Sequence, residues 1–184
     1  MKTAITGGLG SGKSFVCRLL AQQGISVYDC DAAAKRLMRQ SPTLRRQLTD
    51  LIGPDTYGPD GQLNKAAVSR FLLASPDNTA AINAIVHPAV MADFDQSGQQ
   101  WLESAILFDA RLDHLFPRIV AVIAPLEVRL QRIMQRDGIT RQQAQEWIDR
   151  QLPQEEVARR SHHVIVNDGQ RPLLPQLLPL LKAP

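Results

Sequence analysis

The sequence of 184 residues lacks the features that mark membrane-spanning and secreted proteins. It has no apolar run near the roughly 18 residues that a membrane span requires. It has only two cysteines, Cys17 and Cys30, without C-x-x-C spacing, and its N-terminus does not resemble a signal peptide. We therefore expect a reducing compartment, the cytoplasm, in which both cysteines serve packing.

Aromatic residues are few, at 5%, and the net charge of +3 is not gathered into a long basic block. This composition favours an anionic small ligand over a nucleic-acid surface or a membrane. The hydrophobic content of 44% is sufficient for one α/β domain with a core and a small inserted subdomain. We expect a monomer or a weak homo-oligomer.

The segment from Gly7 to Ser14 matches the phosphate-binding pattern G-x-x-x-x-G-K-[ST]. It follows a short expected strand over 2–6 and precedes an apolar helical pattern, as a strand–loop–helix unit requires. Glycines let successive backbone N–H groups point at phosphates, and the next helix adds its positive end. Lys13 would then reach the β- and γ-phosphates, and the Ser14 hydroxyl would bind Mg²⁺. The alternative is a glycine turn with an incidental lysine.

Strand and helix patterns alternate along the chain, which predicts a parallel sheet with helices on both faces. We expect further strands over 25–28, 118–124 and 164–166, and an apolar run over 101–108. We expect helices over 32–52 with a break at Ser41–Pro42, over 65–73, from Ser75–Pro76 with an interruption at His87–Pro88, and over 127–160 with a turn at Asp137–Gly138. The leucines over 173–181 are assigned to core packing.

Ligands of such sheets bind beyond the carboxyl ends of the strands, where Asp29 and Asp31 follow the second expected strand. Asp31 is our candidate for the base that accepts the proton of the acceptor, and its alternative is an N-cap of the next helix. Asp29 is the competing candidate, either as an indirect contact of the site or as a ligand of a Mg²⁺-bound water. Two roles stay open for His87: a hydrogen bond to a substrate group and a structural role. His162–His163 lacks the spacing of a metal site.

Two absences narrow the class of phosphate-loop protein. The sequence has no N-K-x-D for guanine, and we expect no Walker-B carboxylate because the strand over 119–124 runs into Pro125. A helical hairpin with many arginines follows that strand, as expected for the lid of a small-molecule kinase. Arg136, then Arg132 and Arg141, are the candidates for contact with the transferring phosphoryl group, and the alternative is a solvated helix face.

Several segments together resemble those of dephospho-CoA kinases, in the same order and over essentially the whole chain. They are Thr6–Ser14 (T-G-G-L-G-S-G-K-S), Asp29–Ala32 (D-C-D-A), Asp60–Leu63, His87–Pro88, Glu103–Phe108 and Val164–Gly169. The resemblance implies a P-loop NTPase-type parallel five-stranded sheet sandwiched by helices, with a helical acceptor-binding insert and a helical lid. The expected core covers 1–30, 101–126 and 161–184, the insert 31–100 and the lid 127–160.

The resemblance also implies ATP-dependent phosphorylation of the ribose 3′-hydroxyl of dephospho-CoA, with Mg²⁺. The expected catalytic residues are Lys13, Asp31 as the base, and Arg136. The expected contacts to ATP are Gly8, Gly10, Ser11, Gly12, Lys13, Ser14, Phe15, Arg132, Arg141 and Asn167, the last in a turn by the adenine. The expected contacts to the acceptor are Asp31, His87 and Leu107, and the expected metal ligand is Ser14.

The chain departs from the family pattern at a few positions. Phe15 replaces the usual Thr, Asn64–Lys65 stands where Asp-Arg is common, Asp109 replaces a Glu, and Trp147 replaces an Arg of the lid. Two other functions stay open from the residues alone: another small phosphate-loop kinase acting on a nucleoside or a sugar, and a nucleotide-binding regulatory module without turnover.

Overall fold

The computed structural model describes residues 1–182, so residues 183 and 184 of the expected core segment 161–184 lie outside the described residues. The chain divides into two compact units. The first unit contains Met1–Tyr28 and Gln99–Pro184, and the second contains Asp29–Gly98. The assignments of 31–100 as an acceptor-binding insert and 127–160 as a lid stay predictions.

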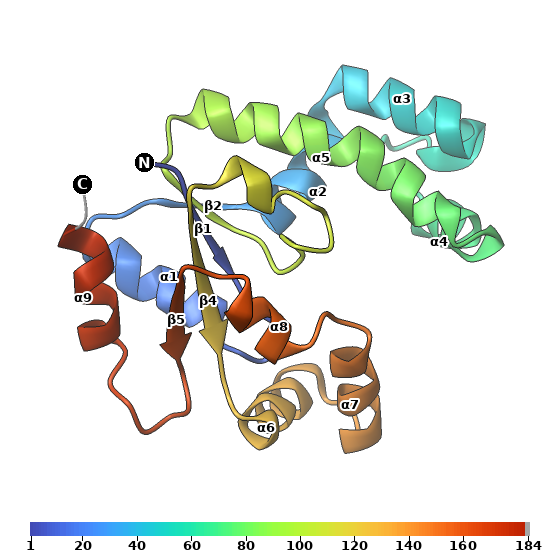
Figure 1. Cartoon of the computed structure of the whole chain (residues 1–184). Coiled ribbons are helices and arrows are strands. Elements are labelled where there is room, and N and C mark those ends of the chain that lie inside the picture. The colour runs from blue at the N-terminus through green and yellow to red at the C-terminus, as the bar shows by residue number, and fades with distance from the viewer. Residues whose placement is uncertain (183–184) are drawn as a thin grey trace. The chain divides into compact units, whose positions relative to one another are not determined.

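A five-stranded sheet forms the centre of the first unit, in the order β2-β3-β1-β4-β5 (Figure 1). The strands are β1 Thr3–Thr6, β2 Val27–Asp29, β3 Trp101–Glu103, β4 Arg118–Ile123 and β5 His163–Val166. Strand β1 pairs in parallel with β3 and β4, and β4 pairs in parallel with β5. The predicted five-stranded parallel sheet is confirmed, and its carboxyl edge lies where the phosphate loop leaves β1.

Five helices accompany this sheet. They are α1 Lys13–Gln22, α6 Leu126–Asp137, α7 Arg141–Asp149, α8 Gln154–Arg159 and α9 Leu174–Lys182, with a short 3₁₀ turn, η2, at Asp113–Leu115. Helices α1 and α9 lie on one side of the sheet, and α8 lies on the other side against β4 (Figure 1). One face of the sheet therefore meets Val16 and Leu20 of α1 and Leu177 and Leu180 of α9. The predicted packing role of the C-terminal leucines is confirmed.

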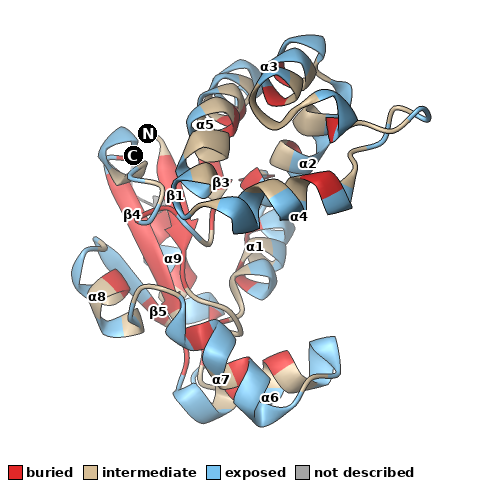
Figure 2. Ribbon diagram, turned by 90° about the vertical axis from the view of Figure 1, so that its right-hand side faces the viewer, coloured by how far each residue is buried: buried red, intermediate tan, exposed pale blue. Residues whose placement is uncertain are grey.

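Burial follows this arrangement, because the central strands β1 and β4 are enclosed within the unit (Figure 2). All four residues of β1 are buried, and so are five of the six residues of β4. Such continuously buried strands are typical of parallel sheets covered on both faces. A rigid sheet edge is the result, and it fixes the loops that follow β1, β3 and β4.

The second unit is helical. It contains α2 Cys30–Gln40, α3 Pro42–Ile52, η1 Pro54–Thr56, α4 Lys65–Ala74 and α5 Asp77–Ser97, and α5 packs against α2, α3 and α4. The predicted break at Ser41–Pro42 is confirmed, because Ser41 ends α2 and accepts the N–H of Leu44 to begin α3. Asn64 caps α4 by accepting the N–H groups of Ala66 and Ala67, so the amide does the capping that a carboxylate could do there.

The predicted interruption at His87–Pro88 is wrong, because α5 runs without a break through Pro88. Proline lacks one backbone N–H and crowds the preceding turn, which usually ends or bends a helix. Here Val86, Val90 and Phe94 are buried on both sides of Pro88. Their packing outweighs the lost hydrogen bond and keeps the two halves in one helix.

Within residues 1–182, no helix combines the length and the apolar character that crossing a membrane requires.

Candidate nucleotide site

The phosphate loop leaves β1 in a shape that only glycine permits at two positions. Gly7 has φ +143°, and a Cβ there would lie 2.2 Å from the carbonyl oxygen of Val122. Gly12 has φ +93°, and a Cβ there would lie 2.0 Å from Nδ2 of Asn167. Both positions combine a left-handed backbone with close approach of neighbouring atoms, which excludes other residues. The tight turn then delivers the chain into α1.

The beginning of α1 is open to an anion. Gly12 is the N-cap and provides no side-chain acceptor, and the first turn has no acidic residue. The first N–H groups of a helix have no partner within it, and they carry the positive end of the helix dipole. Ser11 adds a buried hydroxyl oxygen without a hydrogen-bond partner among the described residues. A helix start without an acidic side chain and an orphaned hydroxyl in one glycine-rich loop fit a bound phosphate group.

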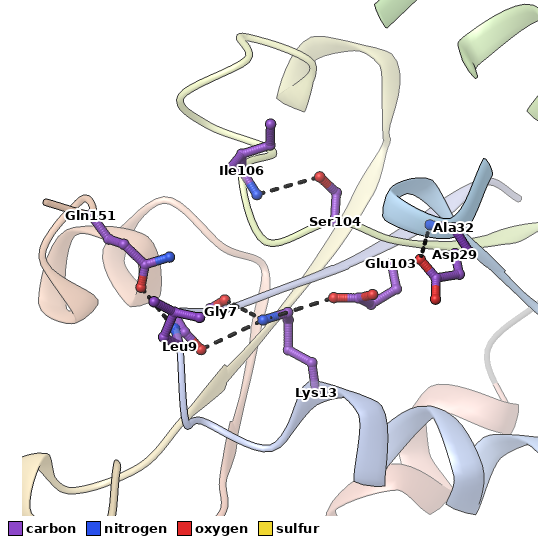
Figure 3. Close-up of polar contacts among 10 residues, drawn as sticks. Gly7, Leu9, Lys13, Asp29, Ala32, Glu103, Ser104, Ile106 and Gln151 are labelled. Carbon is purple, nitrogen blue, oxygen red and sulfur yellow. Dashed lines mark hydrogen bonds and ion pairs between the residues drawn. The ribbon is translucent and has the colours of Figure 1, made fainter. Parts of the chain in front are cut away.

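Lys13 lies against the loop and near a carboxylate (Figure 3). Its Nζ donates to the carbonyl oxygen of Gly7 at 2.7 Å and lies 3.8 Å from Oε1 of Glu103. Both side chains are largely enclosed, with 11% of Lys13 and 14% of Glu103 exposed. Glu103 is the last residue of β3 and is in register with Ile5 of β1. The charge of Lys13 is therefore partly neutralised until phosphates arrive.

The expectation that no carboxylate closes an apolar strand is wrong. Trp101 and Leu102 are buried, and Glu103 ends the strand that they form beside β1. The strand has three residues, too few for a period to be read in the sequence. Its neighbour in the chain, Ser104, donates its N–H to the carbonyl of Ile5, so the backbone pairing with β1 extends past Glu103.

Two side chains from outside the loop hold its apex at Leu9. Arg129 of α6 donates its Nε–H to the carbonyl oxygen of Leu9 at 2.8 Å. Gln151 accepts the N–H of Leu9 at 2.7 Å through Oε1 (Figure 3). Arg129 is only 5% exposed, and its burial lowers the pKa of the guanidinium, with Glu155 acting in the opposite direction. For this arginine the solvated-face alternative is wrong.

Arg132 and Asn167 complete the frame of the loop. Nη1 of Arg132 donates to the carbonyls of Gly10 and Ser11, and Nη2 donates to Oδ1 of Asn167 at 3.2 Å. Nδ2 of Asn167 donates to the carbonyl of Ser11 at 2.8 Å. The amide of Asn167 thus binds the loop through Nδ2 and Arg132 through Oδ1, and its predicted proximity to adenine stays a prediction.

A cavity of about 760 Å³ opens in front of this loop. Such a volume is typical of a small-molecule site. The cavity contains Lys13, Ser14 and Phe15 of α1, and Arg132 and Arg136 of α6. Its other lining includes Gly8, Gly10, Gly12, Arg18, Leu19, Asn167, Gly169, Arg171, Pro172, Leu173 and Leu174. Most of the residues predicted to contact ATP therefore share one hollow, and Arg141 is not among its lining.

The two outer arginines have acidic partners on the surface. Arg136 forms a bidentate pair with Asp137, and Arg141 forms one with Glu127. The hydrogen bonds to Arg136 and Arg141 lower the pKa of Asp137 and of Glu127 respectively. Arg136 lines the cavity and Arg141 does not, although the two side chains are about equally exposed, at 58% and 57%. Contact of either arginine with a phosphoryl group stays a prediction.

In the second unit, Asp29 and Asp31 have different surroundings. Asp29 is the N-cap of α2, and its Oδ1 accepts the N–H of Ala32 at 2.9 Å (Figure 3). The alternative in which Asp31 caps this helix is therefore wrong, because α2 begins at Cys30 and Asp31 lies in its first turn. Asp31 is exposed and makes no hydrogen bond or ion pair with any residue of the described part of the chain. Its carboxylate is available, and its role as base stays a prediction.

The other predicted acceptor contacts are less open. His87 lies half-buried in α5, where burial lowers its pKa. Leu107 is fully buried, and its carbonyl accepts the N–H of Leu112. Both assignments stay predictions. The roles of Arg129 and Gln151 could not be predicted, because no local sequence pattern marks a side chain that reaches Leu9 from another element.

Comparison with known proteins agrees with this geometry. The family model for dephospho-CoA kinase matches residues 1–172. A dephospho-CoA kinase of Bacteroides fragilis is 38% identical over 98% of this chain and 91% of its own length, and one of Chlorobaculum tepidum is 36% identical over 90% and 85%.

Two solved structures have a similar fold. The Thermus thermophilus protein TT1252 has a TM-score of 0.79 and 32% identity, covering 99% of this chain and 94% of its own. The dephospho-CoA kinase of Campylobacter jejuni shares the fold, with a TM-score of 0.64 and 16% identity over 99% and 95%. A chain with this phosphate loop, matched by the family model over 1–172, belongs to the dephospho-CoA kinase family.

Proposed function

We propose that this chain transfers the γ-phosphoryl group of ATP to the 3′-hydroxyl of the ribose of dephospho-CoA, which yields coenzyme A and ADP. The single observation that carries the proposal is the family match over residues 1–172 of a chain whose phosphate loop is folded for an anion. We expect the reaction to occur in the cytoplasm and the enzyme to be a monomer or a weak homo-oligomer.

The donor end of the reaction rests on the first unit. The N–H groups at the start of α1 would bind the phosphates, and Lys13 would leave the carbonyl of Gly7 for the β- and γ-phosphates. Arg136 would neutralise charge on the transferring group from the cavity wall. Bound Mg²⁺ would supply charge neutralisation between the phosphates. Ser14 fits as its protein ligand, because Mg²⁺ keeps waters and phosphate oxygens as most of its ligands.

The acceptor end rests on Asp31. The 3′-oxygen forms a bond to the γ-phosphorus as the bond from that phosphorus to the β–γ bridging oxygen breaks, and the hydroxyl proton passes to the Asp31 carboxylate. An ordinary carboxylate is basic enough because the transition state is loose and the proton can leave late. Asp31 has no competing partner in residues 1–182, whereas Asp29 is held by its cap.

Mass analysis of dephospho-CoA after incubation with ATP and Mg²⁺ tests the proposal. We expect a gain of one phosphoryl group on the 3′-oxygen, and much lower kcat/KM for adenosine and AMP, which carry the same ribose without the pantetheine arm. Asp31→Asn should lose the reaction and Asp29→Asn should keep most of it. The proposal is wrong if AMP or a sugar is the better acceptor.

A further inference from the structure

Phe15 is an aromatic side chain left half-exposed inside the nucleotide cavity. It follows Ser14 in the first turn of α1, 46% of it is exposed, and it lines the cavity of the phosphate loop. Leu174, at the start of α9, is 41% exposed and lines the same cavity, next to Pro172. A folded protein leaves apolar surface open in a cavity at a cost, so such a surface marks the place of an apolar part of a ligand.

The phosphate loop indicates which part of a nucleotide this surface meets. Lys13 and the first N–H groups of α1 fix the β- and γ-phosphates at the loop. The nucleoside must then lie farther along the same cavity. Beyond the phosphate loop itself, the lining of the cavity includes Phe15 of α1 and the segment 171–174 that follows β5.

The ring of Phe15 is held in place from its own helix. The guanidinium carbon of Arg18 lies 5.4 Å from the ring centroid, a distance at which a cation is attracted to an aromatic face. Arg18 is three residues farther along α1, so the two side chains share one face of the helix. A fixed ring loses little freedom when a flat base stacks on it.

The polar groups around this surface provide little means of reading a base by hydrogen bonds. No carboxylate lines the cavity within the described residues, and Asn167 is the one amide side chain there. Both polar atoms of Asn167 bind Arg132 or Ser11. The carboxylate of Asp168 accepts the N–H groups of Gln170 and Arg171 instead.

We infer that Phe15 is the stacking platform for the purine base of the phosphoryl donor, and that it selects purine over pyrimidine nucleotides by contact area. This inference depends on the proposed function only for the identity of ATP as donor. Stacking on an aromatic ring needs no matching hydrogen bonds, so preference follows the size of the base. Phe15 is then a specificity residue that acts on binding, distinct from the groups that act on the γ-phosphate.

Dissociation constants of ATP and CTP, measured by calorimetry without acceptor, test this role. Phe15→Ala should weaken ATP about tenfold, within the range of stacking losses on alanine substitution, and should weaken CTP by less than about threefold. Phe15→Tyr should keep the ATP to CTP ratio of the unmodified chain. Leu178→Ala removes an equally exposed residue of α9 that does not line the cavity, and it should change neither constant.

Melting temperatures of the same variants separate a platform from a packing residue. A platform predicts a larger ratio of the ATP dissociation constant to the CTP dissociation constant in Phe15→Ala, at an unchanged melting temperature. An unchanged ratio, or equal losses for ATP and CTP, would overturn the inference. If no phosphoryl group is transferred to dephospho-CoA but the ratio of the ATP and CTP dissociation constants still depends on Phe15, the proposed function is refuted. The stacking role of Phe15 is then still supported.

Discussion

Replacement of Glu103 by Gln should reduce the Mg²⁺ dependence of nucleotide binding. The change keeps the shape of the side chain and removes a charge that lies 3.8 Å from Lys13 Nζ in an enclosed setting. At an effective dielectric constant near 20, two unit charges at this distance attract by about 4 kcal/mol. Desolvation of both groups cancels much of that energy, so we expect a net loss of about 1–2 kcal/mol in unfolding free energy. For a chain of this length the melting temperature should fall by roughly 2–8 °C.

The same carboxylate repels the phosphates of ATP when Mg²⁺ is absent. At the same dielectric constant, a like charge at an assumed separation on the order of 10 Å costs roughly 1.5 kcal/mol, which is about tenfold in a dissociation constant. Glu103→Gln should therefore bind ATP about tenfold more tightly than the unmodified chain in EDTA. With Mg²⁺ present the advantage should disappear, because the cation neutralises phosphate charge and the carboxylate can accept from its waters.

Calorimetric titration of ATP with and without Mg²⁺ measures both effects, and Glu127→Gln is the matched control. Glu127 undergoes the same chemical change on the surface, where it pairs with Arg141, and it should leave nucleotide binding unchanged. If Glu103→Gln binds Mg²⁺-free ATP no more tightly than the unmodified chain, the charge of Glu103 does not act on the phosphates and our reasoning fails.

Four further outcomes are expected. Lys13→Ala should lower kcat by about 10²- to 10³-fold with the fold intact by circular dichroism, and more than half of normal activity would contradict its catalytic role. Asp31→Asn should lower kcat by about 10²-fold or more at nearly unchanged ATP affinity, and equal losses in both would contradict its role as base. Burial lowers the pKa of His87 below its usual 6.5, so near this pH the unfolded chain binds a proton that the folded chain does not. The free energy of unfolding should therefore fall as pH drops through about 6.5. Denaturant unfolding of His87→Gln should lack this pH dependence. Arg136→Ala should depress kcat more than Arg141→Ala in steady-state assays, and small equal effects would support a solvated face for both.

The phosphate loop could be predicted because its chemistry is local. Gly7 and Gly12 are required by backbone angles and close contacts that any chain of this pattern meets, and the pattern places Lys13 and Ser14 at the start of a helix. The breaks at Ser41–Pro42 and Asp137–Gly138 also follow local rules of capping and left-handed backbone. Local rules therefore identify this part of the site from the sequence.

Strand β3 and its carboxylate could not be predicted in the same way. Three residues carry no measurable period, and Trp101 and Leu102 become a strand through pairing with β1. Glu103 gains its importance from that register, which sets it near Lys13. At Pro88 the error is of the opposite kind, because a local rule was followed and the structure overrides it. Proline usually interrupts a helix, but burial of the surrounding turns keeps α5 continuous here.

The arginines of the predicted lid show most clearly where sequence reasoning ends. Arg129, Arg132 and Arg136 lie at spacings that place them on one face of α6, and helical periodicity treats them alike. The structure separates them, because Arg129 and Arg132 bind carbonyls of the phosphate loop, while Arg136 pairs with Asp137 beside the cavity. An arginine whose guanidinium donates to the loop backbone holds the loop in shape. One with an exposed acidic partner can exchange that partner for a phosphate at low cost. Which of these arginines binds the loop depends on how far the phosphate loop extends along this face of α6. That is a tertiary contact between residues more than a hundred positions apart in the sequence.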